Sequence, residues 1–431
     1  MTAETARFAT RAVHAARTPD TAASRATPIY LTAGFEFDDF DHAAAHFGTG
    51  AGFGYSRTGN PTVRAVERQL ASLESGADAV LVASGQAAVA TALLTVAGAG
   101  DHIVSSTHVY EGTRALLLDN LARLGIETTF VDDIADPAVW RSAVRPNTRA
   151  LFAESVSNAR NDILDVAAVA AVADEHAIPL IVDNTLATPF LVRPIEHGAA
   201  IVVHSASKFL AGHGSVLGGV VIDDGRFDAA TAGHNAPHLV LAARDGGPSV
   251  AARHGGLARI AYARESVAPR FGASPSPLNA FLIGQGAETL GLRVERQSRN
   301  ALAVAEWLAA HPEVESVDYA GLADHPHHRL AARYLSGGYG SIFTFTLRGG
   351  LPAARSFVES VDVFVHMTHI GDVRSLVLHP GTTSHARHTD DAREALGVRP
   401  GTLRLSIGIE DVDDLIGDLD RALTSVREVV A

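Results

Sequence analysis

Short runs of β-branched and apolar residues recur between residues 79 and 222, and this recurrence constrains the fold more than any other feature. Helical patterns, for example at 86–96, 113–124 and 166–176, separate most of the runs. Strands that alternate with helices in this way form parallel sheets with helices on both faces. We therefore predict an α/β domain with a mostly parallel, seven-stranded sheet, whose strands are residues 79–83, 102–106, 127–131, 149–153, 179–183, 200–204 and 218–222.

The pattern changes on either side of this domain. After residues 274–277 (Ser-Pro-Ser-Pro), a helical stretch at about 277–311 precedes only a few strands, notably 341–347 and 402–407. Residues 1–65 are rich in glycine, threonine and proline and look irregular, and residues 226–256 are typical of a loop-rich insertion. A chain of 431 residues is too long for one compact core. We predict an N-terminal extension at 1–65, a large domain at 66–273 and a smaller α+β domain at 274–431.

Composition narrows the possible partners and the cell compartment. The chain has 35 Lys and Arg against 48 Asp and Glu, a net charge of −13, which argues against binding to nucleic acid or to an anionic membrane. It has no cysteine, which excludes disulfides, thiolate catalysis and cysteine metal sites. The first residues lack the apolar core of a signal peptide. We expect a soluble cytoplasmic protein.

Lysine occurs once, at Lys208, and every other residue among the 35 Lys and Arg is arginine. A lysine that survives such a bias is expected to do what arginine cannot, because a desolvated lysine can lose its proton and form an imine, whereas arginine stays protonated. The count alone leaves chance survival of a surface residue equally open. The surroundings favour chemistry, because hydroxyls and glycines flank Lys208 directly after the apolar run 200–203.

Two further elements lie where strands of the predicted sheet end. Residues 84–86 (Ser-Gly-Gln) form a tight strand-to-helix turn, where backbone N–H groups suit a phosphate. Asp183 closes the strand 179–183, where a carboxylate is either a helix cap or the partner of a buried cation. With Lys208 these elements fit pyridoxal phosphate, which needs an amine for its aldehyde, a helix start for its phosphate and a carboxylate for its pyridine nitrogen. Tyr110 could stack on the ring, although an ordinary core aromatic is the alternative.

These residues belong to a series of motifs that runs along nearly the whole chain. The motifs are GYSRTGNPT at 54–62, SGQAA at 84–88, NDILD at 161–165, VDNT at 182–185, VHSASK at 203–208, GHG at 212–214, PLNAF at 277–281, GDVRSLVLHP at 371–380 and RLSIGIE at 404–410. In this order the chain resembles the Cys/Met-metabolism family of pyridoxal-phosphate enzymes, in particular its O-acetylhomoserine sulfhydrylase branch. The resemblance implies the type I PLP-dependent transferase fold.

The resemblance also implies roles for particular residues. Lys208 would bind the cofactor covalently and move protons, Asp183 would pair with the pyridine nitrogen, and Tyr110 would stack on the ring. Arg404, with Ser375, would bind the substrate α-carboxylate. The other expected contacts are Asn158 at the ring hydroxyl and substrate, and Gly85, Gln86, Ser205 and Ser207 at the phosphate. Tyr55 and Arg57 would reach the cofactor phosphate of a neighbouring subunit, and Tyr55 would also contact the substrate.

Alternation of apolar residues turns the Arg404 side chain away from its apolar neighbours in the sequence. This pattern suits a fork for a carboxylate, although a solvated strand arginine would show it too.

The implied reaction is a γ-replacement on an O-acylated homoserine. Lys208 would remove the Cα proton and help to remove one at Cβ, acetate would leave Cγ, and sulfide or a small thiol would add there. The products would be homocysteine or methionine. Burial would favour the neutral amine that this chemistry needs. Because Tyr55 and Arg57 would reach a neighbouring cofactor, a homodimer is the minimal unit and a homotetramer is expected.

Three positions depart from the family pattern. Glu111 follows Tyr110 where glycine is usual, residues 157–160 (Ser-Asn-Ala-Arg) replace Gly-Asn-Pro-Gly, and His369 stands where asparagine is common. All three could flank the substrate, so the acyl donor (acetyl, succinyl or phosphoryl) and the nucleophile stay open. A carbon or nitrogen nucleophile in specialised metabolism is one alternative.

Other functions explain fewer of the sequence features described above. Within the family the alternative is a methionine or cystathionine γ-lyase, but methionine γ-lyases commonly carry a cysteine where this chain has Gly112. The glycine run 50–54 suggests a dinucleotide-binding oxidoreductase, yet it neither follows a strand nor opens an evident helix. A non-catalytic scaffold would not need Lys208, Asp183 and Arg404 together. The histidines at 325–328 and 385–388 are more typical of loops than of a metal site.

Overall fold

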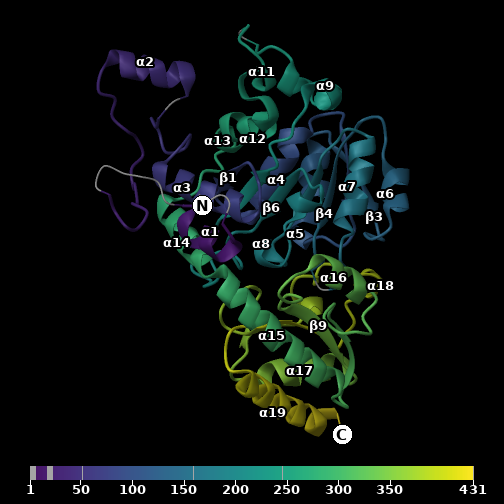
Figure 1. Cartoon of the computed structure of the whole chain (residues 1–431). Coiled ribbons are helices and arrows are strands. Elements are labelled where there is room, and N and C mark those ends of the chain that lie inside the picture. Colours follow the sequence, from purple (N-terminus) through teal and green to yellow (C-terminus); the bar gives the residue numbers. More distant parts are fainter. Residues whose placement is uncertain (1–5, 17–22, 51, 159, 245, 431) are drawn as a thin grey trace.

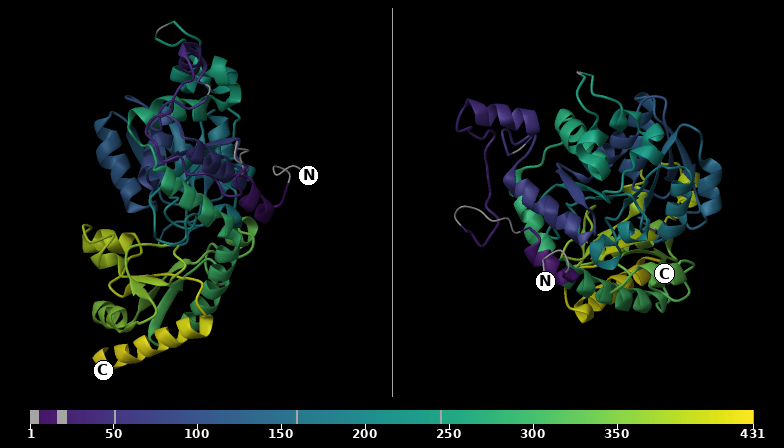
Figure 2. Two further views of the ribbon diagram at one scale, coloured as in Figure 1. Left: turned by 90° about the vertical axis from the view of Figure 1, so that its left-hand side faces the viewer. Right: turned by 45° about the horizontal axis from the view of Figure 1, so that its top comes forward.

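The computed structural model describes residues 6–16, 23–50, 52–158, 160–244 and 246–430. Within these residues the chain forms one seven-stranded sheet and one five-stranded sheet. Figure 1 shows the larger sheet in the upper part of the molecule and the smaller one below it, and the views in Figure 2 show the same division. No helix in the described residues combines the length and the apolar character needed to span a bilayer.

The large sheet confirms the strand pattern predicted from the sequence. Its strands are β1 (Asp78–Val82), β2 (His102–Ser106), β3 (Glu127–Val131), β4 (Thr148–Glu154), β5 (Leu180–Asp183), β6 (Ile201–His204) and β7 (Gly219–Asp223). Their spatial order is β1-β7-β6-β5-β4-β2-β3. Strand β7 runs antiparallel to both of its neighbours, and the other pairs are parallel. Each predicted run lies within one residue of an observed strand at both ends.

Helices cover both faces of this sheet, which explains why its strands are apolar throughout. Successive residues of a strand point to opposite faces, so Leu151 and Val182 lie in one core while Phe152 and Ile181 lie in the other. The first face packs against α3 (Pro61–Leu73), α6 (Pro137–Ala143) and α7 (Val166–Glu175), and the second against α4 (Gly85–Val96) and the π-helix at Leu116–Leu121 that continues α5 (Glu111–Ala115).

The C-terminal domain packs helices against its own five-stranded sheet. Its strands are β8 (Val314–Asp318), β9 (Ile342–Leu347), β10 (Val365–His366), β11 (Leu376–Leu378) and β12 (Thr402–Ser406), in the order β10-β11-β12-β9-β8. Strands β10 and β11 are parallel, and the other pairs are antiparallel. Its helices are α15 (Leu290–Ala309), α16 (His328–Tyr334), α17 (Gly350–Ser360), α18 (Asp390–Ala395) and α19 (Val412–Val430). Strands β9 and β12 correspond to the predicted runs 341–347 and 402–407.

The long helix predicted at 277–311 is two helices, α14 (Pro277–Glu288) and α15, which meet at Thr289. The Gly286 carbonyl accepts hydrogen bonds from the Thr289 N–H and hydroxyl and from Arg293 Nη2. Arg293 Nη1 also donates to the Phe209 carbonyl. The end of α14 is therefore tied to the large domain beside Lys208, a long-range contact that helical periodicity cannot reveal.

The N-terminal region is more regular than its composition suggested, so the prediction of an irregular 1–65 was wrong. It contains α1 (Phe8–His14) and α2 (Phe40–Thr49), and α3 begins at Pro61 with Asn60 as its N-cap. Residues 31–50 and 52–57, which include α2 and which we call the N-terminal arm, stand away from the large domain (Figures 1 and 2). Residues 1–5, 17–22 and Ala51 of this region lie outside the described residues.

Short helices make up the remainder of the large domain. They are α8 (Thr188–Leu191), the 3-10 helix Pro194–His197, α9 (Ala229–Ala232), the 3-10 helix Gly233–Asn235, α10 (Pro237–Val240), α11 (Val250–His254), the 3-10 helix Gly255–Leu257, α12 (Ala258–Tyr262), the π-helix Ala263–Val267 and α13 (Ala268–Arg270). The region 226–256 therefore alternates loops with single helical turns, as its small residues suggested.

Candidate active site

Polar side chains gather where the parallel strands of the large sheet end. Glu154 ends β4 and Asp183 ends β5, and the two residues are partners in the register of these strands. Lys208 follows β6 after a short turn. Because parallel strands end at the same edge of a sheet, this edge is where ligands collect in open α/β folds.

Lys208 is a partly buried amine that reaches across to the C-terminal domain. Its Nζ lies 3.1 Å from Nδ1 of His369. Burial, together with the positive charge of Arg404, lowers the pKa of Lys208 to about 8. At neutral or slightly alkaline pH a sizeable fraction of the amine is therefore uncharged and nucleophilic.

Asp183 and Glu154 place two carboxylates side by side. Asp183 Oδ1 accepts hydrogen bonds from the N–H and the hydroxyl of Thr185 at 3.0 and 2.5 Å. Burial raises the pKa of Asp183. Burial and the neighbouring charge of Asp183 raise the pKa of Glu154 to about 8. Within the described residues neither carboxylate forms an ion pair.

Glu154 also fixes the segments that carry two of the predicted contact residues. Its carboxylate accepts hydrogen bonds from the Tyr110 N–H at 2.5 Å and from the Asn158 N–H at 3.0 Å. Tyr110 keeps 49% of its surface exposed. A Cβ on Gly112 would lie 2.5 Å from Cε1 of this tyrosine, so a side chain there would displace the ring. The ring is thus a fixed, accessible flat surface beside the two carboxylates.

Arg404 brings the C-terminal domain into the same place. The residue is only 7% exposed, and its guanidinium donates to Asn158 Oδ1 and to the Thr368 carbonyl, both at 3.3 Å. Burial lowers its pKa to about 10. No carboxylate of the described residues pairs with it, so a cation is held in the protein interior by neutral groups alone. An anionic group of a ligand would compensate such a charge.

The start of α4 lies against the turn that leads to Lys208. Ser84 caps the helix by accepting from the Ala87 N–H, which leaves other first-turn N–H groups directed outward. A Cβ on Gly85 would lie 2.6 Å from the Ser205 Cβ, so only glycine allows this approach. Gln86 holds the Tyr110 segment, because its Nε2 donates to the Gly112 carbonyl at 2.8 Å.

Other predicted residues have side chains engaged elsewhere. The Ser207 hydroxyl both donates to and accepts from the backbone of Gly218. The buried Ser375 hydroxyl donates to Glu410 at 2.9 Å and accepts from the Gly408 N–H. Ser375 is thus a support for the loop beside Arg404 in this structure. Whether Ser207 and Ser375 touch a ligand stays a prediction.

Tyr55 and Arg57 lie on the arm and are exposed. Arg57 donates to the Pro269 carbonyl at 3.1 Å, and Tyr55 forms a β-bridge with Gly34. Among the described contacts, none joins either residue to Lys208 or Asp183. Their expected role toward a neighbouring subunit remains a prediction.

Residues at all three of the positions that depart from the family pattern have partners in the structure. Glu111 Oε1 lies 3.2 Å from His388 Nε2, a contact between the large domain and the C-terminal domain beside Tyr110. His369 is the residue that contacts Lys208. Ala159 lies outside the described residues, and its neighbour Arg160 pairs with Asp162 at 3.3 Å.

Sequence reasoning missed Glu154, Thr185 and Glu410. Glu154 ends an apolar strand in the way that Asp183 does, so the same signal could have found it. Thr185 lies two residues after Asp183 and donates to it, so the turn that follows β5 was a local signal. Glu410 acts on Ser375, 35 residues away in the chain, and a single sequence carries no signal for such a contact.

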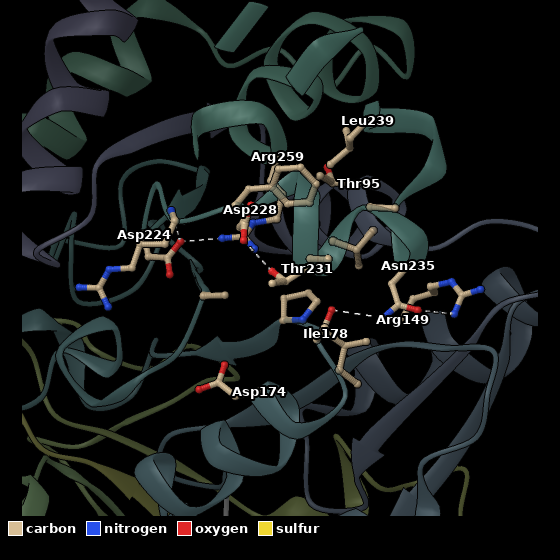
Figure 3. Close-up of a pocket in the computed structure, with 18 of the residues that line it drawn as sticks. Thr95, Arg149, Asp174, Ile178, Asp224, Asp228, Thr231, Asn235, Leu239 and Arg259 are labelled. Atoms are coloured by element: carbon tan, nitrogen blue, oxygen red, sulfur yellow. Dashed lines mark hydrogen bonds and ion pairs between the residues drawn. The ribbon is translucent and has the colours of Figure 1, made fainter. Parts of the chain in front are cut away.

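A second pocket, of about 440 Å³, lies at the opposite edge of the large sheet (Figure 3). Its lining includes Arg149, Pro179 and Ala200, which stand near the starts of β4, β5 and β6. Its two buried or partly buried arginines already have carboxylate partners: Arg259 binds Asp223 and Asp224, and Arg149 binds Asp101. This pocket therefore lacks the uncompensated charges found around Lys208.

The chain is similar to known proteins along nearly its whole length. A family model described as Cys/Met metabolism PLP-dependent enzyme matches residues 9–424. O-acetyl-L-homoserine sulfhydrylase of Corynebacterium glutamicum is 42% identical over 97% of this chain and 97% of its own. Homocysteine synthase of Schizosaccharomyces pombe is 40% identical over 98% of this chain and 99% of its own.

A solved structure extends the likeness to three dimensions. The O-acetylhomoserine (thiol)-lyase of Campylobacter jejuni, determined with N'-pyridoxyl-lysine-5'-monophosphate, has a TM-score of 0.92 and 35% identity, and the match covers 97% of this chain and 100% of that one. The chain belongs to the Cys/Met-metabolism family of pyridoxal-phosphate-dependent enzymes.

Proposed function

We propose that this enzyme carries out γ-replacement on O-acetyl-L-homoserine with sulfide or a small thiol, giving L-homocysteine or methionine plus acetate. The observation that carries this proposal is Arg404, a buried cation that has no acidic partner among the described residues and that lies close enough to Lys208 to lower its pKa. It can bind the α-carboxylate of an amino acid while Lys208 acts on Cα. The names of the relatives supply the acyl donor and the nucleophile.

The charges of the residues at this site are sufficient to fit the family's cofactor. In the part of the chain that the structure describes, Asp183 and Glu154 form no ion pair, and a protonated pyridine nitrogen would supply a cation. Asp183 is the better placed, because both Glu154 oxygens already accept backbone N–H groups. Lys208 would bind the aldehyde, Tyr110 the ring face, Asn158 the ring hydroxyl, and Gly85, Gln86, Ser205 and Ser207 the phosphate. When bound, the cofactor withdraws electrons from Cα and so makes the loss of its proton possible.

Lys208 would serve as the proton carrier of the reaction. When it is not joined to the cofactor, the neutral amine would be able to take the Cα proton and later help to take one from Cβ, so that the acyloxy group could leave Cγ as a carboxylate. Arg404 would hold the substrate carboxylate through its two-pronged guanidinium and so fix Cα beside this amine.

We also propose an assembly in which the N-terminal arm reaches a second subunit. Phe40 and Phe47 on α2, and Leu31 earlier in the N-terminal region, are 86%, 83% and 75% exposed, and apolar surface of this kind is typical of an interface with another chain. Tyr55 and Arg57 on the same arm would contact a neighbour's cofactor, so a homodimer is the minimal unit and a homotetramer is expected. The divisions at 1–65, 66–273 and 274–431 and a cytoplasmic location belong to the same proposal.

A direct assay tests the proposed function. The holoenzyme is incubated with O-acetylhomoserine, with and without sulfide, and the products are identified by mass. We expect homocysteine and acetate in equal amounts when sulfide is present, and little 2-oxobutyrate in its absence. Rapid 2-oxobutyrate formation that sulfide does not affect would instead identify a γ-lyase. O-succinylhomoserine and methanethiol, run in parallel, define the donor and the thiol.

The pKa of Lys208 predicts how cofactor binding depends on pH. Only the neutral amine attacks an aldehyde, and burial lowers the pKa of Lys208 to about 8. In full-length protein stripped of cofactor, the rate of cofactor attachment at saturating pyridoxal phosphate should rise as pH increases through about 8 and then level off. Stopped-flow absorbance at several pH values measures this rate. A midpoint near the ordinary lysine value of about 10.4 would contradict the placement of Lys208.

Replacing Arg404 by leucine should weaken substrate binding, while the cofactor stays bound. Loss of a charged hydrogen bond to the carboxylate corresponds to about a 10- to 100-fold fall in kcat/KM. Because the charge of Arg404 helps to lower the pKa of Lys208, the midpoint of cofactor attachment should also move to higher pH. An unchanged kcat/KM for O-acetylhomoserine would rule out the role given to Arg404.

A further inference from the structure

His369 meets Lys208 because a loop of the C-terminal domain is pinned against the turn that carries the lysine. The Gly371 N–H donates to Ser406 Oγ at 3.0 Å, and the Val373 N–H donates to the Gly212 carbonyl at 2.9 Å. Gly371 has a φ of 73°, and a Cβ there would lie 2.8 Å from the backbone nitrogen of Phe209. The loop cannot move away without breaking these contacts, so the 3.1 Å distance between His369 Nδ1 and Lys208 Nζ is built into the fold.

The imidazole of His369 is neutral in this position. Burial, and next the charge of Lys208, lower its pKa to about 4. Asp372 acts in the opposite direction, and Arg374 and Arg404 act in the same direction as Lys208. A neutral imidazole has one donor and one acceptor nitrogen. If Lys208 donates to Nδ1, the imidazole proton is on Nε2, which is buried and has no hydrogen-bond partner among the described residues.

We propose that His369 is a positioning residue for Lys208: its Nδ1 accepts a hydrogen bond from the released lysine amine. This inference rests on the proposed function, since it assigns to Lys208 the transfer of the Cα proton. No proton passes to His369. When Lys208 takes the Cα proton it becomes an ammonium group, and Nδ1 continues to accept from it.

The hydrogen bond between Lys208 Nζ and His369 Nδ1 stabilises the ammonium form of Lys208 and fixes the orientation of its amine. Truncation of His369 to alanine should therefore lower the pKa of Lys208 and slow proton transfer. Asparagine at the same position retains a carbonyl oxygen as acceptor and should restore part of both. His366, three residues earlier on the exposed strand β10, offers a matched control, because His366→Asn makes the same change away from Lys208.

The single lysine of the chain makes the pKa of Lys208 directly measurable. Protein labelled with ¹⁵N at lysine Nζ gives one side-chain amine signal, which is titrated in the holoenzyme saturated with α-methylmethionine, an amino acid that frees the lysine but has no Cα proton. We expect H369A to lower the pKa of Lys208 by about 1 unit and H369N by less than half as much, with H366N unchanged. Exchange of the Cα proton of L-methionine in deuterated water should fall about 10-fold in H369A.

Two results separate this inference from the proposed function. An unchanged pKa of Lys208 in H369A, with an unchanged exchange rate, would overturn the role of His369. A shifted pKa and slowed exchange in an enzyme that fails to transfer the aminocarboxypropyl group to sulfide would support that role and overturn the proposed function alone.

Discussion

Replacing Lys208 by alanine is expected to abolish the covalently bound chromophore and to lower kcat by about 10⁴-fold. The amine is the only side chain of its kind in the protein, and it serves both as the attachment point of the cofactor and as the proton carrier. The variant should still fold, because Lys208 contributes no ion pair among the described residues. Visible absorbance, turnover of O-acetylhomoserine and far-ultraviolet circular dichroism measure the three effects.

Lys208→Arg is the matched control for charge. Arginine keeps the positive charge near Arg404 and His369 but stays protonated and cannot form the bond to the aldehyde. It should be as inactive as the alanine variant. Turnover above a thousandth of the wild-type rate in either variant would mean that another group moves the Cα proton.

Replacing Asp183 by asparagine is expected to lower kcat by about 10- to 100-fold, with weaker cofactor binding. Asparagine can keep the hydrogen bonds that Asp183 accepts from Thr185, so the local fold should survive. It cannot hold the pyridine nitrogen protonated, and a hydrogen bond to a charged group is lost. Turnover, equilibrium dialysis of the cofactor and the position of its absorbance band report these losses.

Asp418→Asn separates chemistry from stability. Asp418 is also a buried carboxylate, and it accepts hydrogen bonds from the backbone N–H groups of Asp362, Val363 and Phe364 in the C-terminal domain. This variant should lower the melting temperature while leaving the absorbance of the bound cofactor unchanged. If D183N kept the wild-type absorbance and kcat, Asp183 would not be the partner of the pyridine nitrogen.

The large domain could be predicted because its signals are local. Strands buried on both faces are continuous apolar runs, and their ends are marked by the polar residues of the site. Lys208 and Asp183 were identifiable from these strand ends and from residue chemistry. The N-caps Asp39 and Asn60 are also local signals, and they indicate α2 and α3 in a region where composition alone suggested irregular structure.

Contacts between segments distant in the chain could not be predicted. His369 lies 161 residues from Lys208, and Arg404 lies 246 residues from Asn158. The break at Thr289 depends on how Arg293 meets the large domain. The engagement of Ser375 by Glu410 joins the segments just before β11 and just after β12, 35 residues apart in the chain. In each case tertiary packing decides the geometry, and the sequence reveals only which residue types are present.

The central claim is that one amine, Lys208, carries the cofactor. The most direct test is to reduce the purified holoenzyme with borohydride, digest it and locate the added pyridoxyl phosphate group by mass spectrometry. We expect one group per chain, on the peptide that contains Lys208. A modification at the N-terminal amine alone, or no stable modification of a yellow enzyme, would contradict this claim.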